Sequence, residues 1–340
     1  MDRTRIILLI AATCLGSALN GQSIRLTELN GIQEASYRAI SIVDEQTAWV
    51  AGSNGMIGRT RDAGSNWEFM QIAGQEKLDF RSIHAFSYDL VMVANAGSPA
   101  RIFRTADGGN TWSVAYRNDH PDAFLDAISF FDGEKGLAVG DPIDGKLLLL
   151  STLNGGISWF PVPLSPAMGA GEAVFAASGT SMRSLTTGTA MIGTGGSTSR
   201  ILMSNDFGQS WIAIPVPGAM NKSSAGIFSL WLNDARSVLG VGGDYEDEKS
   251  TVANIWLTQN GGKKWTTVSQ APGGYRSCVE AIGENLLMAV GPSGADLSSD
   301  KGKTWSPVRC PGGHVIRSSP QKKLILMAGK DRIWRVEVDR

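Results

Sequence analysis

An eight-residue motif, Ser/Thr-x-Asp/Asn-x-Gly-x-x-Trp, occurs six times in this sequence and constrains the fold more than any other feature. Its copies begin at Thr60, Thr105, Thr152, Ser204, Thr258 and Ser298, and they end in six of the ten tryptophans. These tryptophans lie 40 to 54 residues apart. A unit that recurs at about this interval is typical of the blades of a β-propeller. We therefore expect small four-stranded sheets arranged in a ring.

Each residue type of the motif has a structural explanation. An Asp or Asn side chain accepts hydrogen bonds from backbone N–H groups of its own turn, and glycine supplies the positive φ that closes it. The hydroxyl ties the preceding strand to the turn, and tryptophan is large enough to fill the gap toward the next blade. We predict structural, non-catalytic roles for Asp62, Trp67, Asp107, Trp112, Asn154, Trp159, Asp206, Trp211, Asn260, Trp265, Asp300 and Trp305. The six motif segments are called box turns below.

The segments between the box turns alternate in the way short strands do. In the first unit, residues 37–43, 47–51 and 56–60 precede the box turn and residues 67–72 follow it. Glycine occupies 41 of 340 positions, well above its usual share of about 7%. Such an excess indicates many turns and therefore many short strands, which is the pattern of an all-β protein.

The end of the chain predicts how the ring closes. Six complete units run to about residue 309, and residues 314–339 offer three more strands without a box turn. Residues 24–29 can supply the missing fourth strand of a seventh blade, which would leave no exposed sheet edge. We therefore predict a seven-bladed β-propeller whose N-terminal strand closes the last blade. Six blades followed by a C-terminal appendage are the alternative.

The amino end predicts export. Two arginines among the first five residues precede an uncharged run at residues 6–19, which is shorter than the roughly 20 residues of a membrane-spanning helix. A charged start, a short apolar run and small residues are typical of a cleaved secretory signal. We expect residues 1–21 to be a signal peptide and residues 22–340 one propeller domain, periplasmic or secreted. A lipid anchor on Cys14 is the less favoured alternative.

Composition excludes several classes of protein. The 31 Lys and Arg residues balance 32 Asp and Glu residues, whereas nucleic-acid binders normally show a basic excess. Three cysteines and three histidines are too few for a disulfide scaffold, a zinc ribbon or a His-rich metal cage. No Gly-x-Gly-x-x-Gly follows a strand and opens a helix. We therefore expect no cofactor, no bound metal and no nucleic-acid partner, and a monomeric state.

The blade sequences resemble a known family. The box turns resemble the Asp-box of neuraminidase-type repeats, and residues 37–67, YRAISIVDEQTAWVAGSNGMIGRTRDAGSNW, resemble a blade of the photosystem II stability and assembly factor-like propellers. Shorter phrases resemble an exported, non-photosynthetic bacterial branch: Gly97–Arg101, Gly140–Gly145, Ala176–Gly179, Ala225–Ser229, Gly242–Tyr245 and Gly291–Gly294. Members of that branch are sometimes labelled oxidoreductases. The resemblance implies the propeller fold strongly and any activity weakly.

Candidate functional residues gather at one end of the expected channel. The connections from strand four to the next strand one, and from strand two to strand three, lie at the end without box turns, which we call the box-free end. The residues expected there are Arg38, Arg81, Asp126, Glu172 and Arg276 at the first strands, with Asn95, Asp141, Asp244 and Tyr245 in the second-to-third connections. Because arginine pairs bidentately with carboxylates, this ring could hold a ligand carboxylate or a partner's acidic tail.

Alternatives for these residues stay open. The charges could pair only with one another, and Asp244–Glu248 could bind calcium or be a solvated acidic loop. A sialidase-like glycoside hydrolase would use Arg38, Arg81 and Arg276 as its arginine cluster and Tyr245 or Tyr275 as its nucleophile, but the Arg-Ile-Pro phrase of that family is missing. A two-carboxylate hydrolase would draw on Asp126, Asp141 or Glu172. We favour a non-enzymatic propeller that binds a protein or small ligand.

Overall fold

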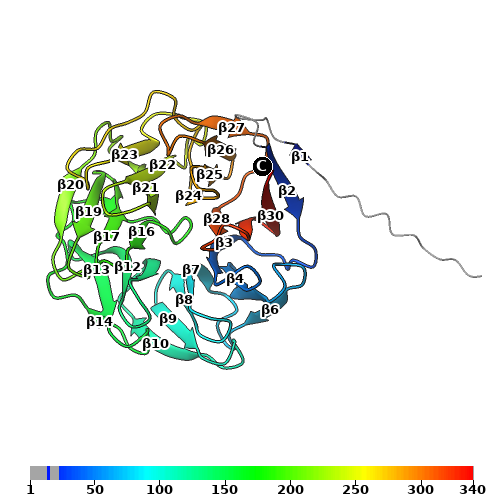
Figure 1. The fold of residues 1–340 in the computed structure, drawn as a ribbon. Helices are drawn as coiled ribbons and strands as arrows, with labels where there is room; N and C mark the ends of the chain where they lie inside the picture. Colours follow the sequence, from blue (N-terminus) through cyan, green and yellow to red (C-terminus); the bar gives the residue numbers. More distant parts are fainter. Residues whose placement is uncertain (1–13, 16–22, 340) are drawn as a thin grey trace, which may run out of the picture.

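The computed structural model describes residues 14–15 and 23–339, which form seven antiparallel sheets arranged in a ring (Figure 1). We number the sheets as blades 1 to 7 in chain order. The innermost strand of each blade contacts that of the next, and blade 7 contacts blade 1, so the ring is closed. No helix long and apolar enough to cross a membrane occurs within the described residues. The predicted all-β, seven-bladed propeller is confirmed.

Blades 1 to 4 each contain four strands, ordered below from the innermost outward. Blade 1 contains β3 (Tyr37–Ile42), β4 (Ala48–Gly52), β5 (Met56–Thr60) and β6 (Glu68–Gln71). Blade 2 contains β7 (Asp79–Ala85), β8 (Val91–Ala96), β9 (Ala100–Thr105) and β10 (Ser113–Asn118). Blade 3 contains β11 (Leu125–Phe130), β12 (Gly136–Ile143), β13 (Lys146–Thr152) and β14 (Phe160–Pro161). Blade 4 contains β16 (Met182–Ser184), β17 (Ala190–Gly193), β19 (Arg200–Ser204) and β20 (Ile212–Pro215).

Blades 5 and 7 depart from this pattern, whereas blade 6 follows it. Blade 5 contains β21 (Lys222–Leu232), β22 (Val238–Asp244) and β23 (Ile255–Thr258), with Thr266 bridging to Leu257 in place of a fourth strand. The short strands β15 (Glu172–Ala173) and β18 (Gly195–Gly196) extend this sheet beside β21. Blade 6 contains β24 (Cys278–Ala281), β25 (Leu287–Gly291), β26 (Gly294–Ser298) and β27 (Ser306–Val308). Blade 7 contains β28 (Val315–Ser318), β29 (Ile325–Gly329), β30 (Arg332–Asp339) and β2 (Ser23–Glu28), beside which lies β1 (Cys14–Leu15).

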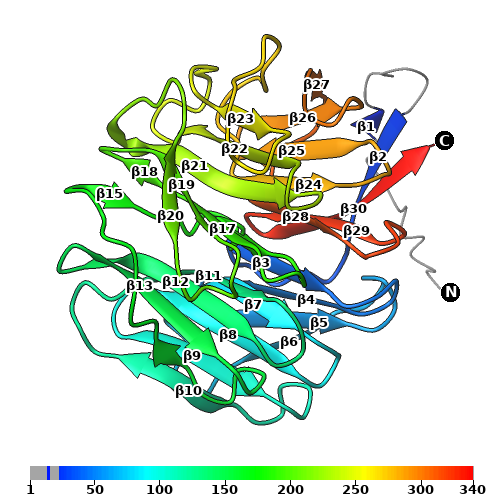
Figure 2. The same ribbon diagram turned by 60° about the vertical axis from the view of Figure 1, so that its left-hand side comes forward.

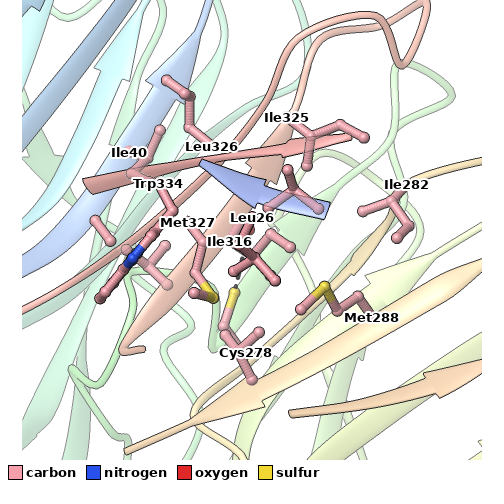
Figure 3. Packing of buried hydrophobic residues seen from close by; sticks show 14 of the residues in the cluster. Leu26, Ile40, Cys278, Ile282, Met288, Ile316, Ile325, Leu326, Met327 and Trp334 are labelled. Carbon is pink, nitrogen blue, oxygen red and sulfur yellow. Dashed lines mark hydrogen bonds between the residues drawn. The ribbon is translucent and has the colours of Figure 1, made fainter. Parts of the chain in front are cut away.

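The N-terminal strand closes blade 7. Strand β2 runs antiparallel to β30 along its whole length, from Ser23 opposite Asp339 to Glu28 opposite Trp334 (Figure 2). Leu26 is buried and points into a hydrophobic cluster of blades 6, 7 and 1 (Figure 3). The predicted closure is therefore confirmed and the six-bladed alternative is wrong. The expected signal peptide lies outside the described residues, apart from the two residues of β1.

The box turns have the predicted hydrogen bonds. In all six copies an Asp or Asn Oδ1 accepts the backbone N–H four residues later, at N···O distances of 2.8 to 3.1 Å. The Ser or Thr hydroxyl accepts the N–H of the motif glycine at 2.8 to 3.1 Å. Each of these glycines has a positive φ, between +74° and +89°. The Asp and Asn side chains of the motif are therefore engaged in holding their own turns.

The predicted direction of the motif tryptophans was wrong. Trp159 of blade 3 packs with Met92 and Ile102 of blade 2, and Trp305 of blade 6 packs with Leu239 of blade 5. The tryptophans fill the gap toward the preceding blade because the box turn itself rests on that blade. A Cβ added to Gly302 would lie 2.0 Å from a methyl carbon of Leu239, so this turn can approach its neighbour only with glycine at that position.

Candidate functional site

A cavity of about 430 Å³ lies at the box-free end of the ring, and we call it the charged cavity. Its lining residues come from blades 1, 2, 3, 5 and 6 and from the connection between blades 3 and 4. They are Arg38, Arg81, Phe124, Asp126, Asp141, Ala173, Val174, Phe175, Ala176, Ala177, Phe228, Tyr245, Glu248, Tyr275 and Pro292. Its size falls within the roughly 300–1,000 Å³ typical of ligand sites.

The floor of the charged cavity is a segment that crosses the central channel. This crossing segment, residues 175–181, leaves β15 and leads into β16 (Figure 1). The Ser178 hydroxyl donates to the Ser277 carbonyl of blade 6 at 2.7 Å, and the Thr180 hydroxyl donates to Ser229 of blade 5 at 2.7 Å. A separate cavity of about 240 Å³ lies on the opposite side of the crossing segment, toward the box-turn end of the channel. The channel is therefore divided in two, which was not predicted from the sequence.

β-Bulges place the charged side chains at the mouth of the channel. In blades 1, 2 and 3 the pairing between first and second strands skips one residue, which is Arg38, Arg81 or Asp126. Asp141 is skipped in the same way between β12 and β13. An unpaired bulge residue re-aims its side chain relative to the rest of the strand. Each of these four residues lines the charged cavity.

A close approach between two backbone segments explains why residue 140, beside the bulge of blade 3, is glycine. A Cβ added to Gly140 would lie 1.8 Å from the carbonyl oxygen of Phe124. Any other residue would push apart the two strands whose ends carry Asp126 and Asp141. This approach of the backbone therefore explains Gly140, the first residue of the phrase Gly140–Gly145.

Two arginines form the basic side of the cavity. The guanidinium of Arg81 donates from Nε to Asp79 Oδ2 at 2.7 Å. Arg38, half-buried on β3, has no hydrogen-bond or ion-pair partner among the described residues. Burial, and then the neighbouring charge of Arg81, lowers the pKa of Arg38. Asp79 attracts Arg38 without forming an ion pair with it. A half-buried cation without an ion-pair partner is costly to desolvate, so an anion from outside would offset this cost.

Two aspartates form the acidic side. Asp126 is fully buried, and neither of its carboxyl oxygens has a hydrogen-bond partner among the described residues. Burial raises the pKa of Asp126 well above its usual value, and the nearby Asp141 raises it further. Burial also raises the pKa of Asp141 to about 6, although its Oδ1 accepts the Val174 N–H at 3.2 Å. Among the described residues, Asp126 therefore has no donor that would stabilise its ionised form, and Asp141 has one backbone donor.

Aromatic rings form the third wall. Phe175 of the crossing segment stacks on Phe228 with ring centroids 4.0 Å apart. Tyr275 meets Phe228 edge-on at 4.8 Å, and Tyr245 does so at 6.2 Å. Burial raises the pKa of the Tyr275 hydroxyl, so this residue remains neutral at physiological pH. The cavity combines an apolar wall with opposite charges on its other sides.

Of the nine residues expected at the box-free end, the structure places five in the charged cavity, namely Arg38, Arg81, Asp126, Asp141 and Tyr245. Their role in binding stays a prediction. The other lining residues are chiefly apolar, and Phe175 and Phe228 carry no sequence signal beyond their apolar character. Among the described residues, no group of three or more His, Cys, Asp or Glu side chains is arranged to hold a metal ion.

Three of the other four residues lie outside the cavity in ion pairs. Glu172 is on β15 and not on the first strand of blade 4 as expected, and it pairs with Arg200 at 2.7 Å. Asp244 accepts the Lys222 ammonium at 2.6 Å. Arg276 donates from Nε to the buried Asp296 at 2.6 Å. The expected ring of three arginines is thus wrong, because a buried internal carboxylate already neutralises the third.

Asn95 also has an internal role. Its side-chain amide donates to the carbonyls of Gly97 and Pro99, and its carbonyl accepts the Arg101 N–H at 2.9 Å. These bonds hold the hairpin between β8 and β9. Asn95 therefore supports a loop at the box-free end and does not line the cavity.

The fold and the cavity define a class: seven-bladed propellers whose central channel is closed inside and open to a charged pocket at one end. The family model described as photosynthesis system II assembly factor YCF48 matches residues 22–116 and 95–219, which together exceed half of the chain. The chain belongs to this family. A search of curated proteins found no match.

Solved structures share the fold at low sequence identity. A structure of YCF48 bound to D1 peptide has a TM-score of 0.67 at 15% identity, covering 92% of this chain and 96% of that one. YCF48 from Cyanidioschyzon merolae has a TM-score of 0.67 at 16% identity, covering 91% and 98%. The GH74 xyloglucanase from Xanthomonas campestris has a TM-score of 0.62 at 15% identity, covering 92% of this chain but 53% of the enzyme. These similarities establish the fold alone.

Proposed function

We propose that this chain is a non-enzymatic binding protein that holds a carboxylate-bearing peptide end of a partner protein in the charged cavity, as an assembly or stability factor does. The observation that carries the proposal is the half-buried Arg38 guanidinium without a partner among the described residues. Arg81 beside it adds a second positive charge. A family relative has been solved bound to D1 peptide, which supports a peptide ligand.

A carboxylate is the anion that suits these two side chains. Guanidinium groups donate paired hydrogen bonds in a fixed plane, and carboxylates accept them bidentately. Binding would give Arg38 the acceptor that it lacks and would offset its repulsion from Arg81. The aromatic wall then provides apolar contact for the rest of the peptide end.

Arg38→Ala is expected to weaken binding of peptides with a free C-terminal carboxylate by about tenfold to a hundredfold, the usual value of a charged hydrogen bond. The measurement uses an array of eight-residue peptides anchored by their N-termini, each made as a free acid and as an amide. Wild-type protein should bind free acids in preference to amides.

The matched control for this experiment is Arg117→Ala. Arg117 lies on the outer strand β10, is exposed and pairs with Asp119, so its removal should leave peptide binding unchanged. Equal binding of acids and amides, or full retention of binding by the Arg38 variant, would contradict the proposed function.

We also propose that the protein acts outside the cytoplasm after residues 1–21 are removed, as the signal-like sequence at the amino end suggests. Expression of the full chain in a bacterial host should give a periplasmic or released product whose N-terminal sequence starts between residues 19 and 22. A product confined to the cytoplasm with an intact amino end would contradict export, and a lipid-labelled product would favour the anchor at Cys14.

A further inference from the structure

The acidic side of the charged cavity is not used by a carboxylate ligand. Asp126 is 0% exposed and neither carboxyl oxygen is hydrogen-bonded to a described residue. Buried polar groups in folded proteins are normally satisfied, and each exception needs an explanation. Since Asp126 lines an open cavity, a donor that enters with the ligand is a direct explanation.

The protein's own cations do not supply that donor. Arg81 attracts Asp126 electrostatically, but its Nε donates to Asp79. Arg38 has no partner among the described residues, including Asp126. Neither arginine forms an ion pair with Asp126 or Asp141, so basic groups and carboxyls face the same cavity without pairing with each other. This arrangement favours a ligand that carries both charges.

We propose that the cavity selects peptides whose C-terminal residue is lysine or arginine. This inference rests on the proposed function. The terminal carboxylate binds Arg38 and Arg81, and the basic side chain donates to Asp126 and Asp141. The aliphatic stem of that side chain lies against the aromatic wall, where a cation also gains from the ring faces.

The shape of the channel favours a chain end over an internal segment. The crossing segment closes the cavity from below through bonds to blades 5 and 6, so a peptide cannot thread through the ring. A cavity of about 430 Å³ accommodates the last residues of a peptide. A terminal lysine or arginine presents a carboxylate and a cation within one residue, which matches two charged walls that share a single cavity.

The affinity should also depend on pH. Burial raises the pKa of Asp141 to about 6, and a bound cation stabilises the ionised form. Binding of a basic terminus therefore strengthens as pH rises through 6 and weakens below it. The charged and titratable groups that face this aspartate across the cavity are Asp126, Arg38, Arg81, Glu248, Tyr245 and Tyr275. The control peptide with a neutral side chain should lack this dependence.

The test uses three fluorescein-labelled peptides and anisotropy titrations. The peptides are Ala-Ala-Ala-Lys as the free acid, Ala-Ala-Ala-norleucine as the free acid and Ala-Ala-Ala-Lys as the amide. Norleucine keeps the stem of lysine and removes its charge. We expect the lysine free acid to bind about tenfold to a hundredfold more tightly than either of the other two.

Two variants test whether Asp126 and Asp141 cause the preference for lysine. Asp126→Asn and Asp141→Asn should each reduce the preference for lysine over norleucine while keeping the preference for the free acid over the amide. Asp119→Asn, an exposed residue on the rim of blade 2, is the matched control and should behave like the wild type. Circular dichroism melts verify folding, and if Asp126→Asn fails to fold, Asp141→Asn and the wild-type peptides still decide the question.

The outcomes separate the two proposals. Equal affinity for the lysine and norleucine free acids, both well above the amide, overturns this inference and leaves the proposed function standing. Equal affinity of all three peptides, or no binding of any, overturns the proposed function and this inference with it. A lysine preference that persists in both aspartate variants also overturns the assignment to Asp126 and Asp141.

Discussion

Trp305→Ala is expected to lower the free energy of unfolding by about 3–5 kcal/mol, as for other large buried aromatic residues. Trp305 is 2% exposed and fills the interface between blades 5 and 6 beside Leu239 and Val279. Its indole N–H donates to the Gly302 carbonyl at 3.0 Å. Alanine would leave a cavity between two blades and remove this bond. The box turn of blade 6 is held by its own hydrogen bonds and cannot move in to fill that cavity.

Trp112→Ala is the matched comparison for Trp305→Ala. Trp112 holds the same motif position and makes the same bond to Gly109 at 3.1 Å, but it is only partly buried. A smaller loss is therefore expected, because less apolar area leaves contact with the protein. Urea denaturation of both variants measures the difference. Equal losses, or an unfolding midpoint of Trp305→Ala within error of wild type, would show that burial between blades does not set the stabilisation.

The sequence was informative about the fold because the propeller repeats its local chemistry. A hydroxyl, a short acid or amide, a glycine and a tryptophan at fixed spacing identify one turn, and six such turns in phase leave few alternatives to a ring. The closing strand followed from the cost of an exposed sheet edge. The direction in which Trp159 packs could not be predicted, since spacing within a turn does not say which neighbouring blade the turn covers.

The candidate site was predictable in part for the same reason. Arg38, Arg81 and Asp126 occupy equivalent positions in successive blades, and the ring brings equivalent positions together. Glu172 was misplaced because the long connection between blades 3 and 4 contains β15 and the crossing segment before the first strand of blade 4 begins. Small residues such as Ala176 and Ala177 give no sequence signal that their segment closes a channel.

Ion pairing distinguishes Glu172, Asp244 and Arg276 from Arg38 and Asp126, whereas Arg81 lines the cavity despite its ion pair with Asp79. Glu172 and Asp244 have basic partners on other strands, Arg200 and Lys222. Such partners lie 28 and 22 residues away in the chain, so no local motif shows them. Arg38 and Asp126 lack such partners among the described residues. The two groups without such partners, Arg38 and Asp126, therefore mark the candidate site, with Arg81 and Asp141 beside them.

Arg276→Met is expected to destabilise the protein by about 3–5 kcal/mol, the usual cost of removing one member of a buried ion pair. Arg276 and Asp296 are 3% and 1% exposed, and they are joined by a bond of 2.6 Å. Methionine keeps most of the volume but leaves Asp296 as an uncompensated buried charge. Since Arg276 does not line the charged cavity, the loss should appear in denaturant unfolding and leave peptide affinity unchanged in the folded fraction.

The double variant Arg276→Met, Asp296→Leu separates the cost of an orphaned charge from the value of the pair. Replacement of both partners by apolar residues removes two desolvated charges together, and such exchanges are often neutral or stabilising. The double variant should therefore recover most of the stability that the single variant loses, apart from the bond between Asp296 and the Gly273 N–H. A double variant as unstable as the single one would mean that the ion pair itself stabilises blade 6. If the single variant instead has wild-type stability but no longer binds peptide, Arg276 takes part in binding.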